Sequence, residues 1–228
     1  MRSPTDADLA AAVDAFTAAV AGSDPAAAVA GCPGWSVTDL VHHVAEVHQW
    51  CAHAVVAGTP DGVPETPPSD LDAAGLASWY AGHAAHLRQV LAEAGTDGPA
   101  WTFGSGPHTA GWWLRRQTHE VLVHTWDVVT AAGADADAVL APDLAWDGVE
   151  EIASMFYPRQ VRLGRTEPLP VTLVLTATDL PGADAVRLGE GPEHRVEGSA
   201  VDLLLTLWRR RPPTDPVVAE ALTRAVTP

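Results

Sequence analysis

The chain places apolar residues three and four positions apart along four long segments, the spacing that an amphipathic helix requires. These segments cover residues 6–20, 36–57, 70–94 and 112–132, and a glycine follows each of them within two residues. The first two segments open with Ser or Thr followed three residues later by Asp, as in a capping box. Four such helices in residues 1–133 predict a four-helix bundle, in which metal sites arise from inward-facing side chains.

Residues 134–228 follow a different pattern, in which short apolar runs alternate with Pro and Gly. Strands are predicted for three of these runs, residues 171–177, 185–188 and 194–197. Helical spacing returns over three segments, residues 143–157, 203–210 and 215–226. We therefore expect a small α+β domain over 134–228 after the bundle over 1–133, and a mainly α fold for the whole chain.

The composition of the chain limits the classes of molecule that it can be expected to bind. The 228 residues carry a net charge of −16, which disfavours nucleic acid and anionic membranes, since both require a basic face. No apolar run reaches the roughly 20 residues that cross a bilayer, and the N-terminus lacks the apolar stretch of a signal peptide. We expect a cytoplasmic protein, a monomer or homodimer, whose two cysteines, Cys32 and Cys51, are free thiols.

The fourth predicted helix carries a candidate pair of metal ligands, Glu120 and His124. Residues four apart lie on the same helix face, so this carboxylate and this imidazole can share one cation. Catalytic zinc sites typically take three protein ligands and leave a fourth position open. The zinc-protease motif His-Glu-x-x-His is absent, because position 123 is Val123. An isolated pair of this kind is more often a solvated ion pair, so the metal hypothesis needs a third ligand.

The second predicted helix offers two histidines for that role, His43 and His48. His48 falls in the middle of the apolar stripe, and His43 lies on its shoulder, so both side chains can point inward. Periodicity does not choose between them. For either one, the ordinary interpretation is a buried neutral histidine with a hydrogen-bond partner.

Three segments resemble the mycothiol-dependent maleylpyruvate isomerase family, which belongs with the DinB-like metal-binding bundles. Cys32–Val44 is similar to its Pro-Gly-Trp-(Ser/Thr)-Val-x-Asp-Leu-x-x-His segment, and Arg116–Asp127 to its Glu-x-x-x-His-x-x-Asp helix. Val196–Arg210 resembles the Gly-x-Ala-x-x-Leu-x-x-x-Leu-(Trp)-Gly-Arg end of its C-terminal domain. The three segments occur in the family's order and cover nearly the whole chain.

The resemblance implies a site and a chemistry. It assigns the metal ligands to His43, Glu120 and His124, and substrate handling to Arg210, although Arg209 replaces the usual glycine and the role can fall to Arg209 or Arg211 instead. The expected cofactor is a divalent metal, Zn²⁺ first, although iron, copper and nickel accept such ligands. Mycothiol is the implied low-molecular-weight thiol, which attacks an electrophilic small-molecule substrate as a metal-bound thiolate.

That chemistry predicts a mycothiol-dependent isomerase or S-transferase. With a cis-enoic acid, thiolate addition, bond rotation and elimination give isomerisation; with a leaving group or an epoxide, the product is a thioether conjugate. Two other functions fit the same bundle. A hydrolase would use the metal to activate water instead of a thiol, and a non-catalytic protein would only bind the metal or a ligand.

Overall fold

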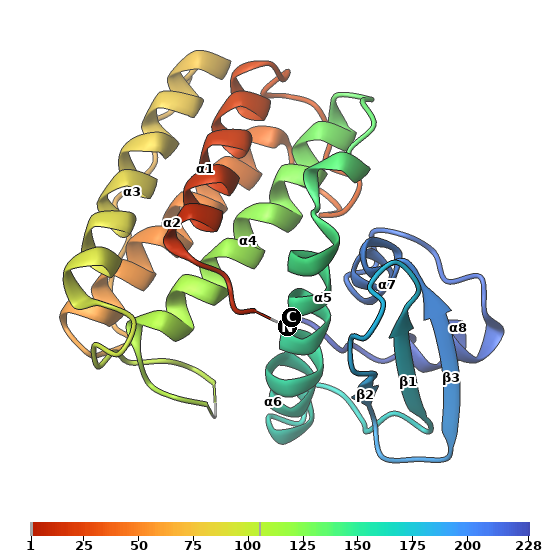
Figure 1. The fold of residues 1–228 in the computed structure, drawn as a ribbon. Coiled ribbons are helices and arrows are strands. Elements are labelled where there is room, and N and C mark those ends of the chain that lie inside the picture. The colour runs from red at the N-terminus through yellow and green to blue at the C-terminus, as the bar shows by residue number, and fades with distance from the viewer. Residues whose placement is uncertain (1, 105) are drawn as a thin grey trace. The chain divides into compact units, whose positions relative to one another are not determined.

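The structure is a computed structural model that describes residues 2–104 and 106–228 (Figure 1). These residues form two compact units. One unit is Pro4–Leu140, and the other is Ala141–Pro228 together with Arg2 and Ser3. The domain division after residue 133 that the sequence suggests stays a prediction. None of the described helices is both long enough and apolar enough to cross a bilayer.

The first unit is the predicted four-helix bundle. Its helices run side by side (Figure 1): α1 (Asp6–Ala21), α2 (Val37–Val56), α3 (Ala73–Ala94) and α4 (Ala110–Ala131), followed by a short 3₁₀ turn, η1 (Asp137–Val139). Both predicted capping boxes form, at the start of α1 and of α2. Helix α3 begins later than the predicted residue 70, because Asp70 adopts a left-handed φ of 64° and Asp72 supplies the cap instead.

Apolar side chains from all four helices fill the bundle core. The largest that are fully buried are Leu9, Phe16, Leu40, Leu76, Tyr80, Leu87 and Trp113. Helix α4 is buried over most of its length, including polar residues such as Gln117 and Asp127. Buried polar groups must find partners within the protein. We therefore expect a functional site among the residues that contact α4.

The second unit is the predicted α+β part. Its elements are α5 (Pro142–Glu151), a π-helical turn η2 (Ile152–Phe156), α6 (Tyr157–Arg162), β1 (Thr172–Ala177), β2 (Val186–Leu188), β3 (Glu193–Gly198), α7 (Ala200–Leu207) and α8 (Pro216–Ala221). The strand order is β2-β1-β3, with β1 antiparallel to β2 and parallel to β3. The fold class expected from the sequence is confirmed.

Three helices of this unit differ from their predicted ranges. Helix α8, expected over 215–226, ends at Ala221, because the backbone N–H groups of Thr223 and Arg224 bond to carbonyls three residues back. The other two differ for local reasons. The helix expected over 143–157 passes through the π turn η2, and Pro158 follows at the start of α6. Proline has no N–H to donate to the preceding turn, so the regular hydrogen-bond ladder cannot continue there. Helix α7 ends at Leu207 rather than at residue 210, because Arg209 adopts a left-handed φ of 59°.

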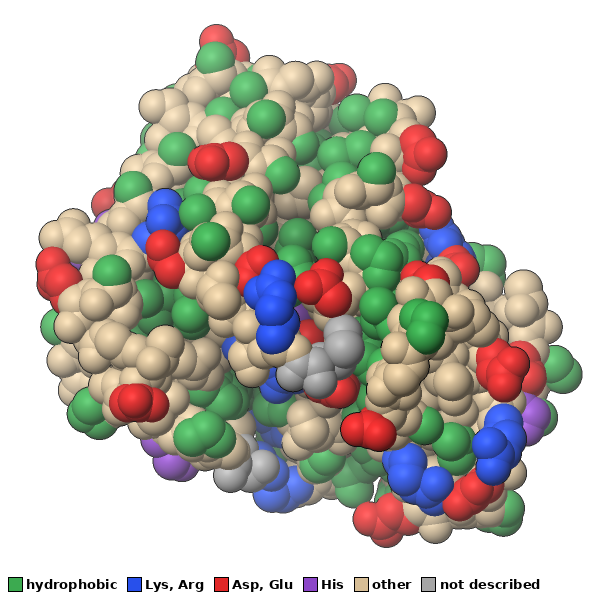
Figure 2. Space-filling model, in the orientation of Figure 1, with side chains coloured by type: hydrophobic (Ala, Val, Ile, Leu, Met, Phe, Trp, Pro, Cys, Tyr) green, Lys and Arg blue, Asp and Glu red, His purple; other side chains and the backbone are tan. Residues whose placement is uncertain are grey.

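The acidic side chains are not gathered in one place on the face that Figure 2 shows. Figure 2 shows Asp and Glu side chains dispersed over the visible face, among apolar and neutral groups. This dispersal fits the net charge of −16. Dispersed like charge favours solubility and keeps surfaces apart, and it identifies no docking face.

The left-handed conformation of Arg209 makes a testable prediction about the end of α7. Its guanidinium donates to the carbonyl of Leu222 at 2.8 Å, and this bond is lost in both Arg209→Gly and Arg209→Ala. The cost of the left-handed backbone then favours glycine and exceeds its larger loss of conformational entropy on folding, so we expect Arg209→Gly to be more stable than Arg209→Ala by up to about 1 kcal/mol. Urea unfolding should show that difference. Equal unfolding free energies would contradict the strain that we assign to this position.

Candidate metal centre

Helices α2 and α4 bring the three predicted ligands together. Nε2 of His43 lies 3.2 Å from Oε1 of Glu120, and Nε2 of His124 lies 3.5 Å from the same oxygen. One donor atom from each of the three residues lies within 4.8 Å of the others. Two imidazoles and one carboxylate are a donor set that zinc commonly takes. The residues present therefore fit a divalent metal, and their role as ligands stays a prediction.

Asp127 fixes the orientation of His124. Its Oδ2 lies 2.9 Å from Nδ1 of His124, and the carboxylate is fully buried. A carboxylate accepts and does not donate, so Nδ1 carries a proton and Nε2 is the ring nitrogen that faces Glu120. Sγ of Cys32 lies 3.9 Å from the same Asp127 oxygen. Metal-binding histidines usually have such an acceptor behind them.

Arg116 contacts the other side of Glu120. Its Nη2 donates to Oε2 of Glu120 at 2.8 Å, and both side chains are largely buried. Burial alone would raise the pKa of Glu120. Hydrogen bonds from His124 and His43 and the charge of Arg116 outweigh it, and hold this pKa well below its ordinary value. The carboxylate is therefore ionised and available to a cation.

The pKa of His124 shifts in the opposite direction to that of Glu120. Burial opposes its charge, but Asp127, Cys32 and Glu120 together raise the pKa of His124 well above its ordinary value. In the absence of a cation, a proton on this ring and the charge of Arg116 together balance the carboxylates of Glu120 and Asp127. A divalent cation would take over that charge balance, so metal binding and proton release are coupled here.

His43 is positioned by the tryptophan that precedes α2. The ring of Trp35 packs on the ring of His43 at 5.0 Å between centroids. The ring of His43 also lies edge-on to that of His124, at 5.5 Å and 85°. The side chain of His43 keeps 35% of its surface exposed. Of the three predicted ligands it is the one that solvent or a substrate reaches most easily.

The comparisons with known proteins agree with this architecture. Residues 7–129 match the family described as "Mycothiol maleylpyruvate isomerase N-terminal domain", and residues 143–226 match the "MDMPI C-terminal domain". The first match alone covers more than half of the chain. The chain belongs to the mycothiol maleylpyruvate isomerase family.

Proteins with and without a stated activity are similar to the chain. Two proteins of Mycobacterium tuberculosis named as uncharacterised, from strains CDC 1551 and H37Rv, are 29% identical over 147 residues, or 62% of this chain and 71% of theirs. Crystal structures of mycothiol-dependent maleylpyruvate isomerase and of a histidine-to-alanine mutant match with TM-scores of 0.62, at 17% and 18% identity and 90% coverage of each chain. At this identity the structural likeness establishes the fold.

His48 is the second histidine that periodicity allowed as a metal ligand. Its contacts are with other residues of the bundle. Its Nδ1 is 2.7 Å from Oε1 of Gln117, and its Nε2 is 3.2 Å from the hydroxyl of Tyr80. The ring is completely buried, and burial lowers the pKa of His48 to about 4. It is a neutral core histidine that links α2, α3 and α4.

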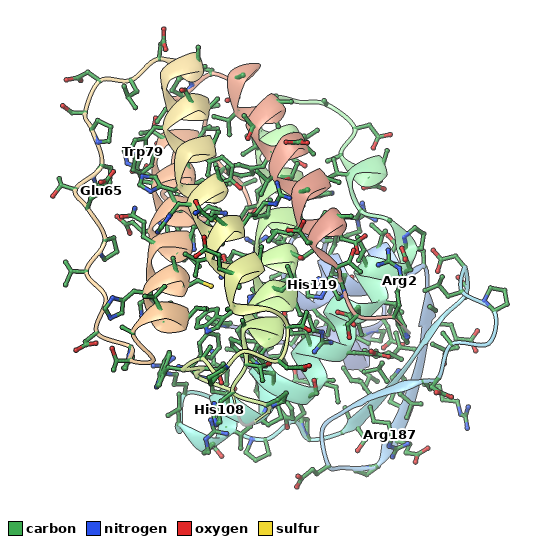
Figure 3. The ribbon with its side chains drawn as sticks, turned by 60° about the vertical axis from the view of Figure 1, so that its left-hand side comes forward. Arg2, Glu65, Trp79, His108, His119 and Arg187 are labelled. Atoms are coloured by element: carbon green, nitrogen blue, oxygen red, sulfur yellow. The ribbon has the colours of Figure 1, made fainter. Side chains whose placement is uncertain are left out.

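A second group of histidines lies between α2, α3 and the loop before α3. Figure 3 shows Glu65 of that loop beside Trp79 of α3, whose indole N–H donates to Oε1 of Glu65 at 3.3 Å. The same oxygen lies 3.0 Å from Nε2 of His83. The ring of His42 packs edge-on against Trp79. These contacts hold the loop on the bundle, and among the described residues this group does not have the donor spacing of a metal site.

Arg210 lies in the other compact unit. Its Nη1 donates to the carbonyl of Trp208 at 2.9 Å, and its guanidinium lies over the Trp208 ring at 5.6 Å. The neighbouring Arg211 pairs with Asp202. The predicted role of Arg210 in substrate handling stays a prediction.

Sequence analysis assigned no role to Asp127, Arg116 or Cys32, although the motifs of the resemblance contain them. The spacing of His124 and Asp127, three apart on one helix, was a usable signal. Arg116 and Glu120 are four apart, which is also a neighbour spacing. Nothing in the spacing of Cys32 placed it near α4, because that contact joins segments 95 residues apart.

Asp127 generates a prediction for metal affinity. Asp127→Asn keeps the size of the side chain but removes the anionic acceptor behind His124. We expect the affinity for zinc to fall about 10- to 100-fold, measured by competition with a chromophoric chelator. Asp97→Asn, which removes an exposed carboxylate from the same unit, is the control and should leave the affinity unchanged. Equal affinities in both variants would contradict the role of Asp127.

His48 generates a prediction for stability against pH. Its pKa is about 4 in the folded state and about 6.5 in the unfolded chain, so the unfolded state binds more protons between these values. Stability due to His48 is therefore complete above pH 6.5 and declines as the pH falls, by about 2 kcal/mol at pH 5. Urea unfolding at pH 7.5 and pH 5 measures this loss.

The variant His48→Gln provides the comparison, because its side chain does not titrate. The decline between pH 7.5 and pH 5 should be about 2 kcal/mol smaller in the variant than in the wild type. The same decline in both proteins would mean that His48 is not the group responsible.

Proposed function

We propose that this protein is a metal-dependent enzyme that uses mycothiol to isomerise or conjugate an electrophilic small molecule. The observation that supports it is the convergence of His43, Glu120 and His124 in a chain of the mycothiol maleylpyruvate isomerase family. Two histidines and one carboxylate leave room for a further ligand in a zinc site. We take zinc as the metal because this donor set is one of its usual ones.

Zinc bound to these three residues would supply the positive charge that keeps a thiol deprotonated at neutral pH. The chain's own residues prepare for that charge. Glu120 is held ionised, and Asp127 holds the Nδ1 proton of His124, so Nε2 is the nitrogen that would bind the metal after releasing its own proton. Because 35% of the His43 side chain is exposed, we expect mycothiol and the second substrate to approach the site from the side of His43.

For isomerisation, the thiolate of mycothiol adds to one carbon of a cis double bond, and the remaining carbon–carbon single bond rotates. Elimination of the thiolate then restores the double bond in trans form and regenerates the thiol. An acidic substrate also needs a cation for its carboxylate, and a guanidinium binds carboxylates by two parallel hydrogen bonds. We assign this contact to Arg210.

The thiol requirement tests the proposed chemistry directly. Zinc-loaded protein is incubated with a panel of electrophiles that includes maleylpyruvate and epoxides, with and without mycothiol, and products are followed by mass spectrometry. We expect isomer or thioether only when mycothiol is present, and at least about 100-fold less with His43→Ala, since removal of a binding group costs several kcal/mol. Turnover at the same rate without a thiol would favour hydrolysis and contradict the proposal.

The assignment of Arg210 is tested by Arg210→Met. Loss of a carboxylate contact should lower kcat/KM for acidic substrates tens- to hundreds-fold, roughly 2–3 kcal/mol of transition-state binding, with unchanged zinc content. Arg187→Met removes an exposed arginine of the same unit and should not change kcat/KM. A lower melting temperature with normal kcat/KM would make Arg210 structural. A loss confined to the Arg209 or Arg211 variant would move the role along the triplet.

A further inference from the structure

The two oxygens of Glu120 have different neighbours. Oε1 faces Nε2 of His43 at 3.2 Å and Nε2 of His124 at 3.5 Å. Oε2 accepts a hydrogen bond from Nη2 of Arg116 at 2.8 Å. We infer that Arg116 is a positioning residue, which reserves Oε2 and leaves Oε1 as the only oxygen that Glu120 offers to a cation. This inference rests on the proposed metal function and concerns how the same site is built.

Helix geometry makes the contact of Arg116 specific. Arg116 and Glu120 are four residues apart on α4, so their side chains lie on one face one turn apart. Only 4% of the Arg116 side chain is exposed, whereas its neighbour Arg115 is half-buried. A guanidinium is planar and directional, and little water competes for it in a buried position. The preference of Arg116 for one oxygen therefore persists when the other oxygen binds a cation.

The choice of one oxygen matters for the coordination number. A carboxylate can bind a metal through one oxygen or through both, and binding through both occupies two positions. With Oε2 held by Arg116, the three protein groups supply one donor atom each. The remaining positions are then left for a thiol and a substrate. Arg116 would thus set how many coordination positions of the metal stay open, and it would not contact the substrate itself.

Cobalt(II) is a suitable probe, because its visible absorption is strong in four-coordinate sites and weak in six-coordinate ones. The wild type is first shown to bind one equivalent of cobalt. If it does not, the proposed metal centre fails, whatever Arg116 does. Arg116→Met and the matched control Arg115→Met are then loaded with cobalt alone and compared in absorption and affinity.

We expect Arg115→Met to match the wild type, and folded Arg116→Met to bind cobalt with visible absorption reduced severalfold, since its second carboxylate oxygen is free to bind. A wild-type spectrum for fully loaded Arg116→Met would overturn the inference. Loss of cobalt binding by folded Arg116→Met would also overturn it, because all three donor groups remain in that variant.

A second pair of variants avoids leaving a buried carboxylate without its partner. In Glu120→Gln, Arg116 can donate only to the amide oxygen, so the amide nitrogen faces the histidines and cobalt binding is lost. In the double variant Arg116→Met/Glu120→Gln, the amide oxygen is free to face them. We expect the double variant to bind cobalt at least tenfold more tightly than Glu120→Gln. If it binds no more tightly, Arg116 does not control which atom faces the site.

Discussion

The buried carboxylate of Glu120 is the group on which the proposed site depends. A carboxylate removed from water is unfavourable unless charged or hydrogen-bonding partners replace the lost solvent. Arg116 supplies one partner from the same helix, and His43 and His124 supply the others. His43 comes from α2, so the packing of α2 against α4 completes the environment of the charge. The fold and the site are therefore linked through one side chain.

Two further charged residues support the side chains around Glu120. Behind His124 lies Asp127, and behind Glu120 lies Arg116, so each of these two inner groups is held by a charged residue of the same helix. Groups held in this way need little reorganisation when a cation arrives, and pre-organisation of this kind favours binding. The candidate centre thus has an ionised carboxylate, a histidine whose Nδ1 proton is held by Asp127, and an accessible third candidate ligand. This is the arrangement on which the proposed thiol chemistry rests.

Much of the fold could be predicted from the sequence, because apolar spacing and helix caps are local signals. The bundle and the α+β part both followed from them, and so did the two capping boxes. The prediction was wrong where single residues adopt unusual backbone conformations. The left-handed φ of Asp70 delays α3, and that of Arg209 ends α7 early. Helix propensities did not indicate that Asp70 or Arg209 would adopt a left-handed backbone conformation.

Part of the candidate site could be predicted from the sequence for the same reason. The pair of Glu120 and His124 lies within one helix turn, so spacing alone revealed it. The choice between His43 and His48 depended on packing between helices, and periodicity left it open. In the structure His48 contacts Gln117 and Tyr80, whereas His43 lies against Glu120, and the assignment of His43 as a ligand stays a prediction. Arg116 and Asp127 have neighbour spacings to Glu120 and His124, but spacing does not show which atoms they contact, and the structure does.

The central claim is that His43, Glu120 and His124 hold one divalent metal. Its most direct test is a zinc titration against a competing chelator, made on the wild type and on the single alanine variants of these three residues. His42→Ala, the neighbour that packs on Trp79 instead, is the control. We predict one equivalent of zinc for the wild type and for His42→Ala, and affinities at least about 100-fold weaker for the other three. Zinc binding that survives in all three variants, or that is absent from the wild type, would contradict the account.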